Sequence, residues 1–179
     1  LHNRTHSFPT RRSSDLITVL TAESMRDHLA RGIGTPELFR VIHSGLDVER
    51  FASGDRKALA RITSWGNEPV IGWAGRLTAI KDCRTFIEAA ALIRDRHPEC
   101  RFFIAGDGEE RDALKALAAR SNFGLALMFG GNRADMPDIM AGLAVFTLTS
   151  LNEGFGRVLV EAMAMGKPIV LGVVGESRE

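Results

Sequence analysis

Two basic residues flank a short loop that follows an apolar run. Arg76 and Lys81 stand five residues apart in the segment Gly75–Asp82 (GRLTAIKD), where a strand is expected to turn into a helix. Arginine presents a planar fork to phosphate oxygens, lysine adds a compact charge, and a helix N-terminus adds backbone N–H groups and a positive dipole. The segment therefore predicts a site for an anion such as a diphosphate. Spacing alone leaves open the alternative that both cations are solvated surface charges.

Two acidic residues accompany a glycine-bearing loop later in the chain. Glu153 lies in the segment Ser150–Arg157 (SLNEGFGR), and Glu161 follows about five residues into a helix expected to begin near Gly156. Gly154 and Gly156 remove side chains where a ligand must approach the backbone closely, and the helix start favours a phosphate or a sugar hydroxyl. Apolar neighbours make the position of Glu161 unfavourable for a charge without a partner. We expect one carboxylate to meet a sugar and the other a ribose; an exposed helical glutamate is the alternative for Glu161.

A third loop, Gly106–Arg111 (GDGEER), begins like a dinucleotide-binding fingerprint but does not complete it. Arg111 stands where the third glycine is required, and no acidic residue follows the next apolar run to hold a ribose hydroxyl. The pattern argues against a Rossmann dehydrogenase. A tight glycine turn capped by Asp107 and a ligand contact stay open as equal alternatives.

Alternating apolar runs and amphipathic segments must position these loops. The expected strands are Val70–Ala74, Arg101–Ala105, Leu125–Phe129, Val145–Leu148 and Pro168–Leu171. The apolar stripes expected on the helices between them are Phe86, Ile87, Ala90 and Ile93, then Leu114, Leu117 and Ala118, then Val158, Leu159, Ala162 and Met163. This alternation predicts an α/β fold with a Rossmann-like, doubly wound parallel sheet. Ligands bind such sheets outside the carboxyl ends of the strands, which is where the three loops lie.

The rest of the chain is expected to divide into parts of different origin. Residues 1–15 lack strand or helix periodicity, and the run HSFPTRRSSDL resembles the translation of a sequencing-library adapter, so we expect this segment to be non-native; a basic targeting peptide is the alternative. Residues 16–52 are expected to be a remnant of an N-terminal domain with the crossing between domains, and residues 53–68 a linker and helix. Residues 69–179 are expected to form the ligand-binding domain, truncated at its C-terminus.

Composition excludes several classes of function. The 179 residues carry 23 basic and 22 acidic side chains, a formal net charge of +1, so nothing indicates a nucleic-acid binder. Cys83 and Cys100 lack the spacing of metal ligands, and we expect reduced thiols. No apolar run approaches the roughly 20 residues that cross a bilayer. We expect a cytoplasmic protein, with peripheral association at the inner membrane face through an N-terminal domain.

Three segments, in this order along the chain, resemble family 4 glycosyltransferases, whose GT-B fold pairs two Rossmann-like domains across a cleft. The segment 41–51 (VIHSGLDVERF) resembles the family's crossing between domains, GRLTAIKD its arginine–lysine diphosphate clamp, and EGFGRVLVE its signature of two glutamates. The resemblance covers almost everything from Thr18 onward. It implies a fragment that contains the donor-binding C-terminal domain of such an enzyme.

The resemblance also implies roles for individual residues. Arg76 and Lys81 are expected to bind the donor diphosphate, and Glu161 the ribose hydroxyls. Glu153 is expected to contact the transferred sugar as the catalytic residue. Backbone contacts to sugar and phosphates are expected from Gly154, Phe155 and Gly156.

The implied activity is transfer of a sugar, with retention at the anomeric carbon, to a glycan, lipid or other acceptor, as in polysaccharide biosynthesis. The donor is expected to be a UDP- or GDP-sugar, with no cofactor and no bound metal ion, because two cations and a helix dipole can neutralise the leaving diphosphate. Two alternatives stay open: a GT-B nucleotide-sugar epimerase, and a nucleotide-diphosphate-binding module that is inactive alone because the family's acceptor loop is missing. The segment 172–176 departs from the Thr-Asp-Gly-Gly pattern that members often show, which leaves the local donor contacts open.

Overall fold

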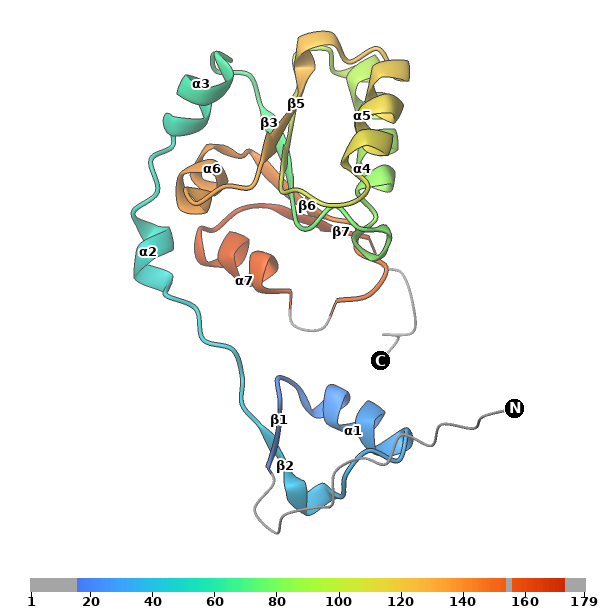
Figure 1. The fold of residues 1–179 in the computed structure, drawn as a ribbon. Helices are drawn as coiled ribbons and strands as arrows, with labels where there is room; N and C mark the ends of the chain where they lie inside the picture. Colours follow the sequence, from blue (N-terminus) through green and yellow to red (C-terminus); the bar gives the residue numbers. More distant parts are fainter. Residues whose placement is uncertain (1–15, 154–155, 173–179) are drawn as a thin grey trace, which may run out of the picture. The chain divides into compact units, whose positions relative to one another are not determined.

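A computed structural model of the chain describes residues 16–153 and 156–172. The chain divides between Gly45 and Leu46 into two compact units (Figure 1). The helix that follows this division, α2 (Val48–Ala52), packs against helices of the C-terminal unit. The domain limits expected from the sequence, which group residues 16–52 together, stay a prediction.

The N-terminal unit is a β–α–β segment. Its elements are β1 (Ile17–Val19), α1 (Ala22–Ala30), the 3-10 turn η1 (Pro36–Leu38) and β2 (Phe39–Val41). The two strands pair in parallel, with Ile17 opposite Phe39. Thr21 caps α1, because its hydroxyl oxygen accepts a hydrogen bond of 3.0 Å from the N–H of Ser24. Thr21 thus occupies the N-cap position, and α1 begins directly after it.

The C-terminal unit is built on a parallel sheet of five strands in the order β5-β4-β3-β6-β7 (Figure 1). The strands are β3 (Val70–Ala74), β4 (Arg101–Ala105), β5 (Leu127–Gly131), β6 (Val145–Leu148) and β7 (Ile169–Leu171). The helices besides α2 are α3 (Ala58–Thr63), α4 (Cys83–Arg96), α5 (Arg111–Arg120), α6 (Met136–Gly142) and α7 (Arg157–Ala164), with 3-10 turns η2 (Ala79–Lys81) and η3 (Gly124–Ala126). The strand order is that of a doubly wound, Rossmann-like sheet, which confirms the predicted fold class.

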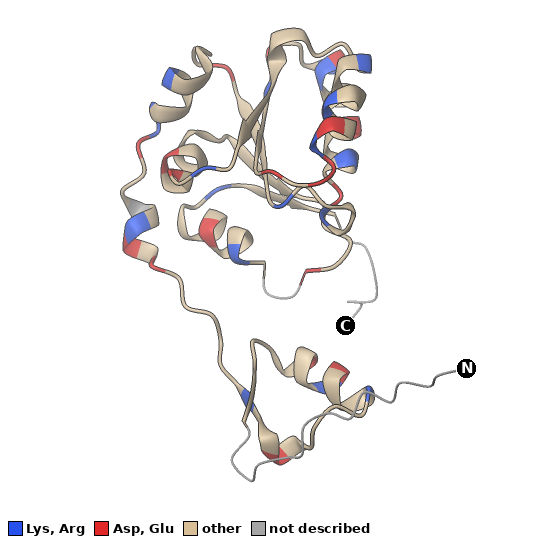
Figure 2. Cartoon of the chain, in the orientation of Figure 1, with Lys and Arg blue, Asp and Glu red and all other residues tan. Residues whose placement is uncertain are grey.

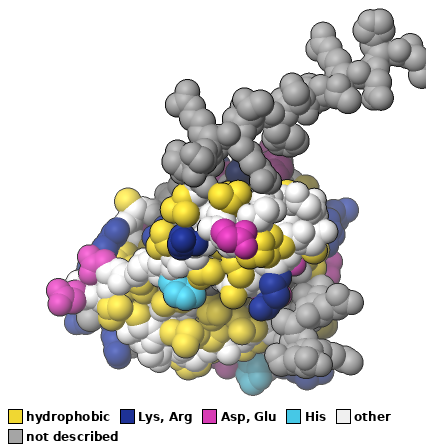
Figure 3. Space-filling view, turned by 90° about the horizontal axis from the view of Figure 1, so that it is seen from below, with side chains coloured by type: hydrophobic (Ala, Val, Ile, Leu, Met, Phe, Trp, Pro, Cys, Tyr) yellow, Lys and Arg dark blue, Asp and Glu magenta, His cyan; other side chains and the backbone are white. Residues whose placement is uncertain are grey.

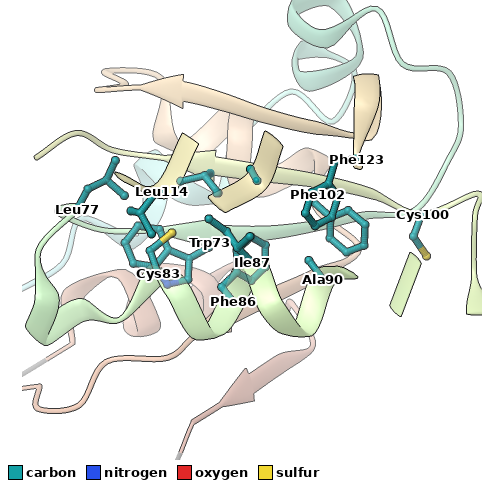
Figure 4. Packing of buried hydrophobic residues seen from close by; sticks show 12 residues of the cluster. Trp73, Leu77, Cys83, Phe86, Ile87, Ala90, Cys100, Phe102, Leu114 and Phe123 are labelled. Carbon is teal, nitrogen blue, oxygen red and sulfur yellow. The ribbon is translucent and has the colours of Figure 1, made fainter. Parts of the chain in front are cut away.

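Helices α4 and α5 cover one face of this sheet, and Figure 4 shows the core between them. Trp73 and Phe102 project from β3 and β4, and both are almost fully buried. Phe102 makes edge-on contacts with Phe86 of α4 and with Phe123, at ring-centroid distances of 6.4 and 5.7 Å. Such aromatic pairs stabilise beyond their buried area. The stripe predicted for α4 is therefore the face that packs on the sheet.

Helices α3, α6 and α7 contribute to the core on the opposite face (Figure 1). Alternate residues of the strands point to this side, among them Phe103 and Phe146, which are fully buried. Ala162 is the buried residue of α7, but Met163 is 62% exposed, so its predicted place in the stripe is wrong. Met163 lies one position, about 100° of helical rotation, beyond Ala162 and therefore points away from the sheet.

Charged residues lie mainly in helices and loops, while the strands are largely free of them (Figure 2). The face drawn in Figure 3 mixes apolar, basic and acidic side chains. Cys83 and Cys100 are both buried and unpaired with each other, and burial raises the pKa of each thiol above its ordinary value. Among the helices of the described residues, none has the length and apolar content needed to span a membrane.

Candidate functional site

The loops that leave β3 and β6 emerge side by side, because these two strands are neighbours in the sheet. The winding of the chain reverses there: β4 and β5 continue on one side of β3, and β7 continues on the far side of β6. Open α/β sheets bind ligands outside the carboxyl ends of their strands at such a switch point. Two of the segments singled out in the sequence, 75–82 and 150–157, contain these two loops.

Lys81 and Glu153 join the two loops at their tips. The lysine Nζ lies 2.5 Å from the glutamate Oε2, and the side chains are 24% and 28% exposed. The backbone N–H of Leu151 donates to the carbonyl of Ile80 at 2.8 Å, so the loops are also tied through their main chains. A cation and a carboxylate are thus held together at the switch point, where the sequence analysis expected each of them to meet a ligand.

A cavity of about 440 Å³ opens beside this point, at the carboxyl ends of β3, β4 and β5. It is lined by Ala74, Gly75, Arg76, Ala105, Gly106, Asp107, Asn132, Arg133, Met136, Val158 and Glu161. Its volume lies in the usual range for a small-molecule site, and it combines small residues with a few charged groups. Two of the predicted site residues, Arg76 and Glu161, line it. Lys81 and Glu153 are not among its lining residues.

Arg76 stands on the rim of this cavity with 76% of its side chain exposed. Its guanidinium lies 3.9 Å from the carboxylate of Glu109, which is also largely exposed. An ion pair of this length at the surface contributes little to stability. This weak pairing leaves the guanidinium largely exposed at the cavity rim, and its predicted contact with a diphosphate stays a prediction.

Glu161 is the acidic residue of the cavity wall. It lies on α7 in the cavity wall, half-buried, and forms no ion pair within the described part of the chain. Burial raises the pKa of its carboxyl above the ordinary value, and the positive charges of Arg157 and Arg50 oppose this shift. A carboxylate in this setting gains from a ligand that donates hydrogen bonds, and the hydroxyls of a sugar ring are such donors. The placement agrees with the prediction that Glu161 needs a partner.

The loop after β4 needs its glycines because it packs closely against the backbone of the loop after β3. Gly106 has a φ of +135°, and a Cβ there would come within 1.8 Å of the carbonyl oxygen of Gly75. A Cβ on Gly108 would meet the carbonyl of Leu77 at 2.3 Å. Asp107 accepts a hydrogen bond from the N–H of Gly108 at 2.9 Å, which is the capped turn considered from the sequence. Gly106 and Asp107 also line the cavity, so the turn shapes the site as well as closing the loop.

Gly156 is the N-cap of α7 and has a φ of +62°, a left-handed conformation that glycine adopts without steric cost. The helix predicted near this residue therefore begins one position later, at Arg157. Gly154 and Phe155, for which backbone contacts were expected, lie outside the described residues. Most of the segment 172–176 lies outside them too.

Arg133 is a site residue that the sequence analysis did not single out. It lines the cavity, and its Nε and Nη2 donate to the two carboxylate oxygens of Asp135 at 2.8 and 2.5 Å. This two-point pairing lowers the pKa of Asp135 and fixes the plane of the guanidinium. The signal in the sequence was the Arg-x-Asp spacing directly after an apolar run, a pattern too common to be informative alone.

Comparison with known proteins identifies relatives along most of the chain. A family model described as "Glycosyl transferases group 1" matches residues 68–179. The lipopolysaccharide core biosynthesis glycosyltransferase LpsE of Rhizobium meliloti is 32% identical over 94% of this chain and 48% of that protein. The D-inositol 3-phosphate glycosyltransferase of Corynebacterium jeikeium is 29% identical over 88% of this chain and 41% of that protein.

A solved structure agrees with the fold described above. The crystal structure of HepE from Anabaena in complex with UDP and glucose matches with a TM-score of 0.76 and 31% identity, over 90% of this chain and 45% of that chain. This chain thus spans less than half the length of each of these relatives. Its described C-terminal unit, with a parallel sheet of five strands, has the Rossmann-like fold of such glycosyltransferases.

Proposed function

Because this chain belongs to the family of group 1 glycosyl transferases, we propose that it forms the donor side of an enzyme that transfers a sugar from a nucleoside-diphosphate sugar to a glycan, lipid or other acceptor. The observation that carries the proposal is the half-buried Glu161 in the wall of a cavity that also exposes Arg76. The cavity lies at the carboxyl ends of the strands beside the switch point, where this kind of sheet binds nucleotides.

We propose that four side chains contact different parts of the donor. Arg76 and Lys81 hold the diphosphate, Glu161 accepts hydrogen bonds from the ribose hydroxyls, and Glu153 contacts the transferred sugar. The first turn of α7 adds free backbone N–H groups and a positive dipole. Gly154, Phe155 and Gly156 are proposed to contribute backbone contacts beside it.

This division suits a reaction in which the bond between sugar and diphosphate breaks. Negative charge then gathers on the departing nucleoside diphosphate, and positive groups fixed in place before the reaction stabilise it without reorganising. Lys81 is held by Glu153 at 2.5 Å, so its ammonium is positioned before the donor arrives. We propose that the sugar is transferred with retention at the anomeric carbon, and proton NMR of the first-formed product distinguishes retention from inversion.

HepE was crystallised with UDP and with UDP-glucose, which makes a UDP-sugar the first donor to test. Calorimetry on this chain with UDP, GDP and ADP tests the donor side directly. We expect binding of at least one of the three, and a loss of roughly tenfold or more in affinity for Glu161→Ala, the range for a hydrogen bond to a charged group. Glu88→Ala is the matched control, since Glu88 is an exposed glutamate that pairs with Arg84 on α4, away from the cavity lining.

Two outcomes would contradict the proposal. Failure of UDP, GDP and ADP to bind would remove the donor role of this chain, and equal affinities for the Glu161→Ala and Glu88→Ala variants would remove the role of Glu161.

The alternative of a nucleotide-sugar epimerase is less favoured than a transferase, because the relatives are named as transferases. Conversion of the nucleotide sugar without any acceptor would reverse that preference. Because the chain spans less than half of its relatives, we propose that it binds donor but needs the remaining part of the enzyme to turn over.

A further inference from the structure

Thr149 occupies the point where the two site loops leave the sheet. It directly follows β6, and its side chain is half-buried. The hydroxyl oxygen accepts a hydrogen bond of 3.0 Å from the indole Nε1 of Trp73. The hydroxyl donates to the carbonyl oxygen of Asp82 at 2.7 Å. The side chain of Thr149, at the start of the loop after β6, therefore links Trp73 near the end of β3 with Asp82, which directly follows Lys81.

Both partners of Thr149, Trp73 and Asp82, are held in place by their surroundings. Trp73 is 1% exposed and lies in the core between the sheet and α4. Asp82 has a φ of +45°, and its carboxylate caps α4 by accepting from the N–H and the hydroxyl of Thr85 at 3.2 and 2.6 Å. A non-glycine residue in this conformation is held there by its surroundings. The Thr149 hydroxyl is one of the groups that hold it.

The link continues outward along the two loops to the ion pair. Next comes the bond from the N–H of Leu151 to the carbonyl of Ile80, and then the contact of Lys81 with Glu153. The alternate residues 149, 151 and 153 of one loop thus meet residues 80–82 of the other. Without the hydrogen bond from Thr149 to Asp82, only the Leu151–Ile80 hydrogen bond and the Lys81–Glu153 contact of these three would remain to order the two loops. Ordering the loops would then cost more conformational entropy per remaining contact.

We propose that Thr149 is a positioning residue for the donor site: its hydroxyl, bridging Trp73 and Asp82, holds Lys81 and Glu153 in register before the donor binds. This inference rests on the proposed function for the nature of the ligand. Its structural content is independent of the ligand, because the register of the two loops exists in the free protein.

Three variants of the full chain separate positioning from general stability. Thr149→Val removes the hydroxyl and keeps the shape, and Thr149→Ser keeps the hydroxyl. Thr147→Val is the matched control, since Thr147 is also half-buried on β6 and donates to the carbonyl of Gly72 at 2.8 Å, but does not reach the site loops. Thr149→Ala replaces the valine variant if that variant does not fold.

The first measurement needs no ligand. Trace acetylation read by mass spectrometry gives the reactivity of the Lys81 ammonium relative to the exposed Lys115. We expect Thr149→Val to raise this ratio about threefold to tenfold, the range for losing one net hydrogen bond. We expect Thr149→Ser and Thr147→Val to leave the ratio at its original value. An unchanged ratio in Thr149→Val, or an equal rise in Thr147→Val, would overturn the proposal.

The second measurement connects positioning with function. Calorimetry with UDP is expected to show a loss of similar size for Thr149→Val, with affinity restored in Thr149→Ser and retained in Thr147→Val. If the original chain binds none of UDP, GDP and ADP, the proposed donor role fails, while the acetylation ratio still decides whether Thr149 positions Lys81. If UDP binds the Thr149→Val variant as tightly as the original chain, the positioning role is overturned and the donor role stands.

Discussion

The ammonium of Lys81 lies 2.5 Å from the carboxylate of Glu153, although 72 residues separate them in sequence. Both side chains are about three-quarters buried, so the pair is shielded from solvent more than an ordinary surface ion pair. In the free protein the carboxylate therefore holds the ammonium in one place. The proposed contact of Lys81 with the donor diphosphate depends on Glu153 for this position.

Replacing Glu153 by glutamine tests this positioning. We expect Glu153→Gln to weaken UDP binding about threefold to tenfold, because the ammonium loses the charged partner that holds it in place. We expect the same change to lower the rate of sugar transfer in the complete enzyme, since Glu153 is proposed to contact the sugar. Calorimetry and transfer assays on one preparation measure both effects. Lys81→Met is the companion variant and should also lose UDP affinity, whereas unchanged or tighter UDP binding in Glu153→Gln would contradict the positioning.

The half-buried carboxyl of Glu161 is expected to lower the stability of the free protein at neutral pH. Burial raises the pKa of its carboxyl in the folded chain above the unfolded value, so its contribution to stability is fully present below the unfolded pKa and is lost as pH rises through the folded pKa. At neutral pH the ionised Glu161 is therefore destabilising relative to a neutral side chain. We expect Glu161→Gln to raise the melting temperature at pH 7.5 by on the order of 1–2 °C, a modest value because solvent screens the half-buried group.

The pH dependence of this difference supplies its control. The melting temperatures of Glu161→Gln and of the original chain should converge as the pH falls well below the ordinary carboxyl pKa of 4.5, because the original carboxyl is then protonated in both states. Glu88→Gln, on an exposed surface of α4, should leave the melting temperature unchanged at both pH values. A lower melting temperature for Glu161→Gln at pH 7.5 would contradict the assignment and point to a partner that stabilises the charge.

Replacing Phe102 tests how much the core between the sheet and α4 contributes to the free energy of unfolding. It is fully buried and touches Phe86 and Phe123 edge-on. We expect Phe102→Ala to lower the free energy of unfolding by about 3–5 kcal/mol through lost burial and a residual cavity. Leu92→Ala is the control, because Leu92 belongs to α4 but is 69% exposed, and it should change stability by less than about 0.5 kcal/mol. Urea unfolding followed by circular dichroism measures both.

The buried strands could be predicted from the sequence to the residue. Val70–Ala74, Arg101–Ala105 and Val145–Leu148 form the strands expected for them, because strands buried on both faces leave continuous apolar runs. The strand expected at Leu125–Phe129 begins two residues later, since Gly124–Ala126 forms a 3-10 turn that leaves Leu125 92% exposed. An apolar run alone does not distinguish a turn from a strand.

The candidate site could be predicted only as separate pieces. Residue types and spacing placed Arg76 after one strand and Glu161 in the helix that follows another, and both line one cavity. The pairing of Lys81 with Glu153 depends on β3 lying next to β6, a neighbour relation that strand patterns do not encode. Thr149 was missed for the same reason, because its partners Trp73 and Asp82 lie on another strand and loop.

Gly106 and Gly124 form a matched pair that separates backbone strain from steric collision. Both have positive φ, at +135° and +56°, but a Cβ at Gly106 would meet the carbonyl of Gly75 at 1.8 Å, whereas nothing lies within 4 Å of a Cβ at Gly124. We expect Gly124→Ala to cost about 1 kcal/mol of stability from the left-handed conformation alone. Gly106→Ala should cost at least about 3 kcal/mol, because the loops after β3 and β4 must also move apart. Since both loops line the cavity, Gly106→Ala should in addition weaken UDP binding, and Gly124→Ala should not. Urea unfolding and calorimetry on the two variants measure these differences, and equal stabilities would mean that the loops separate without cost.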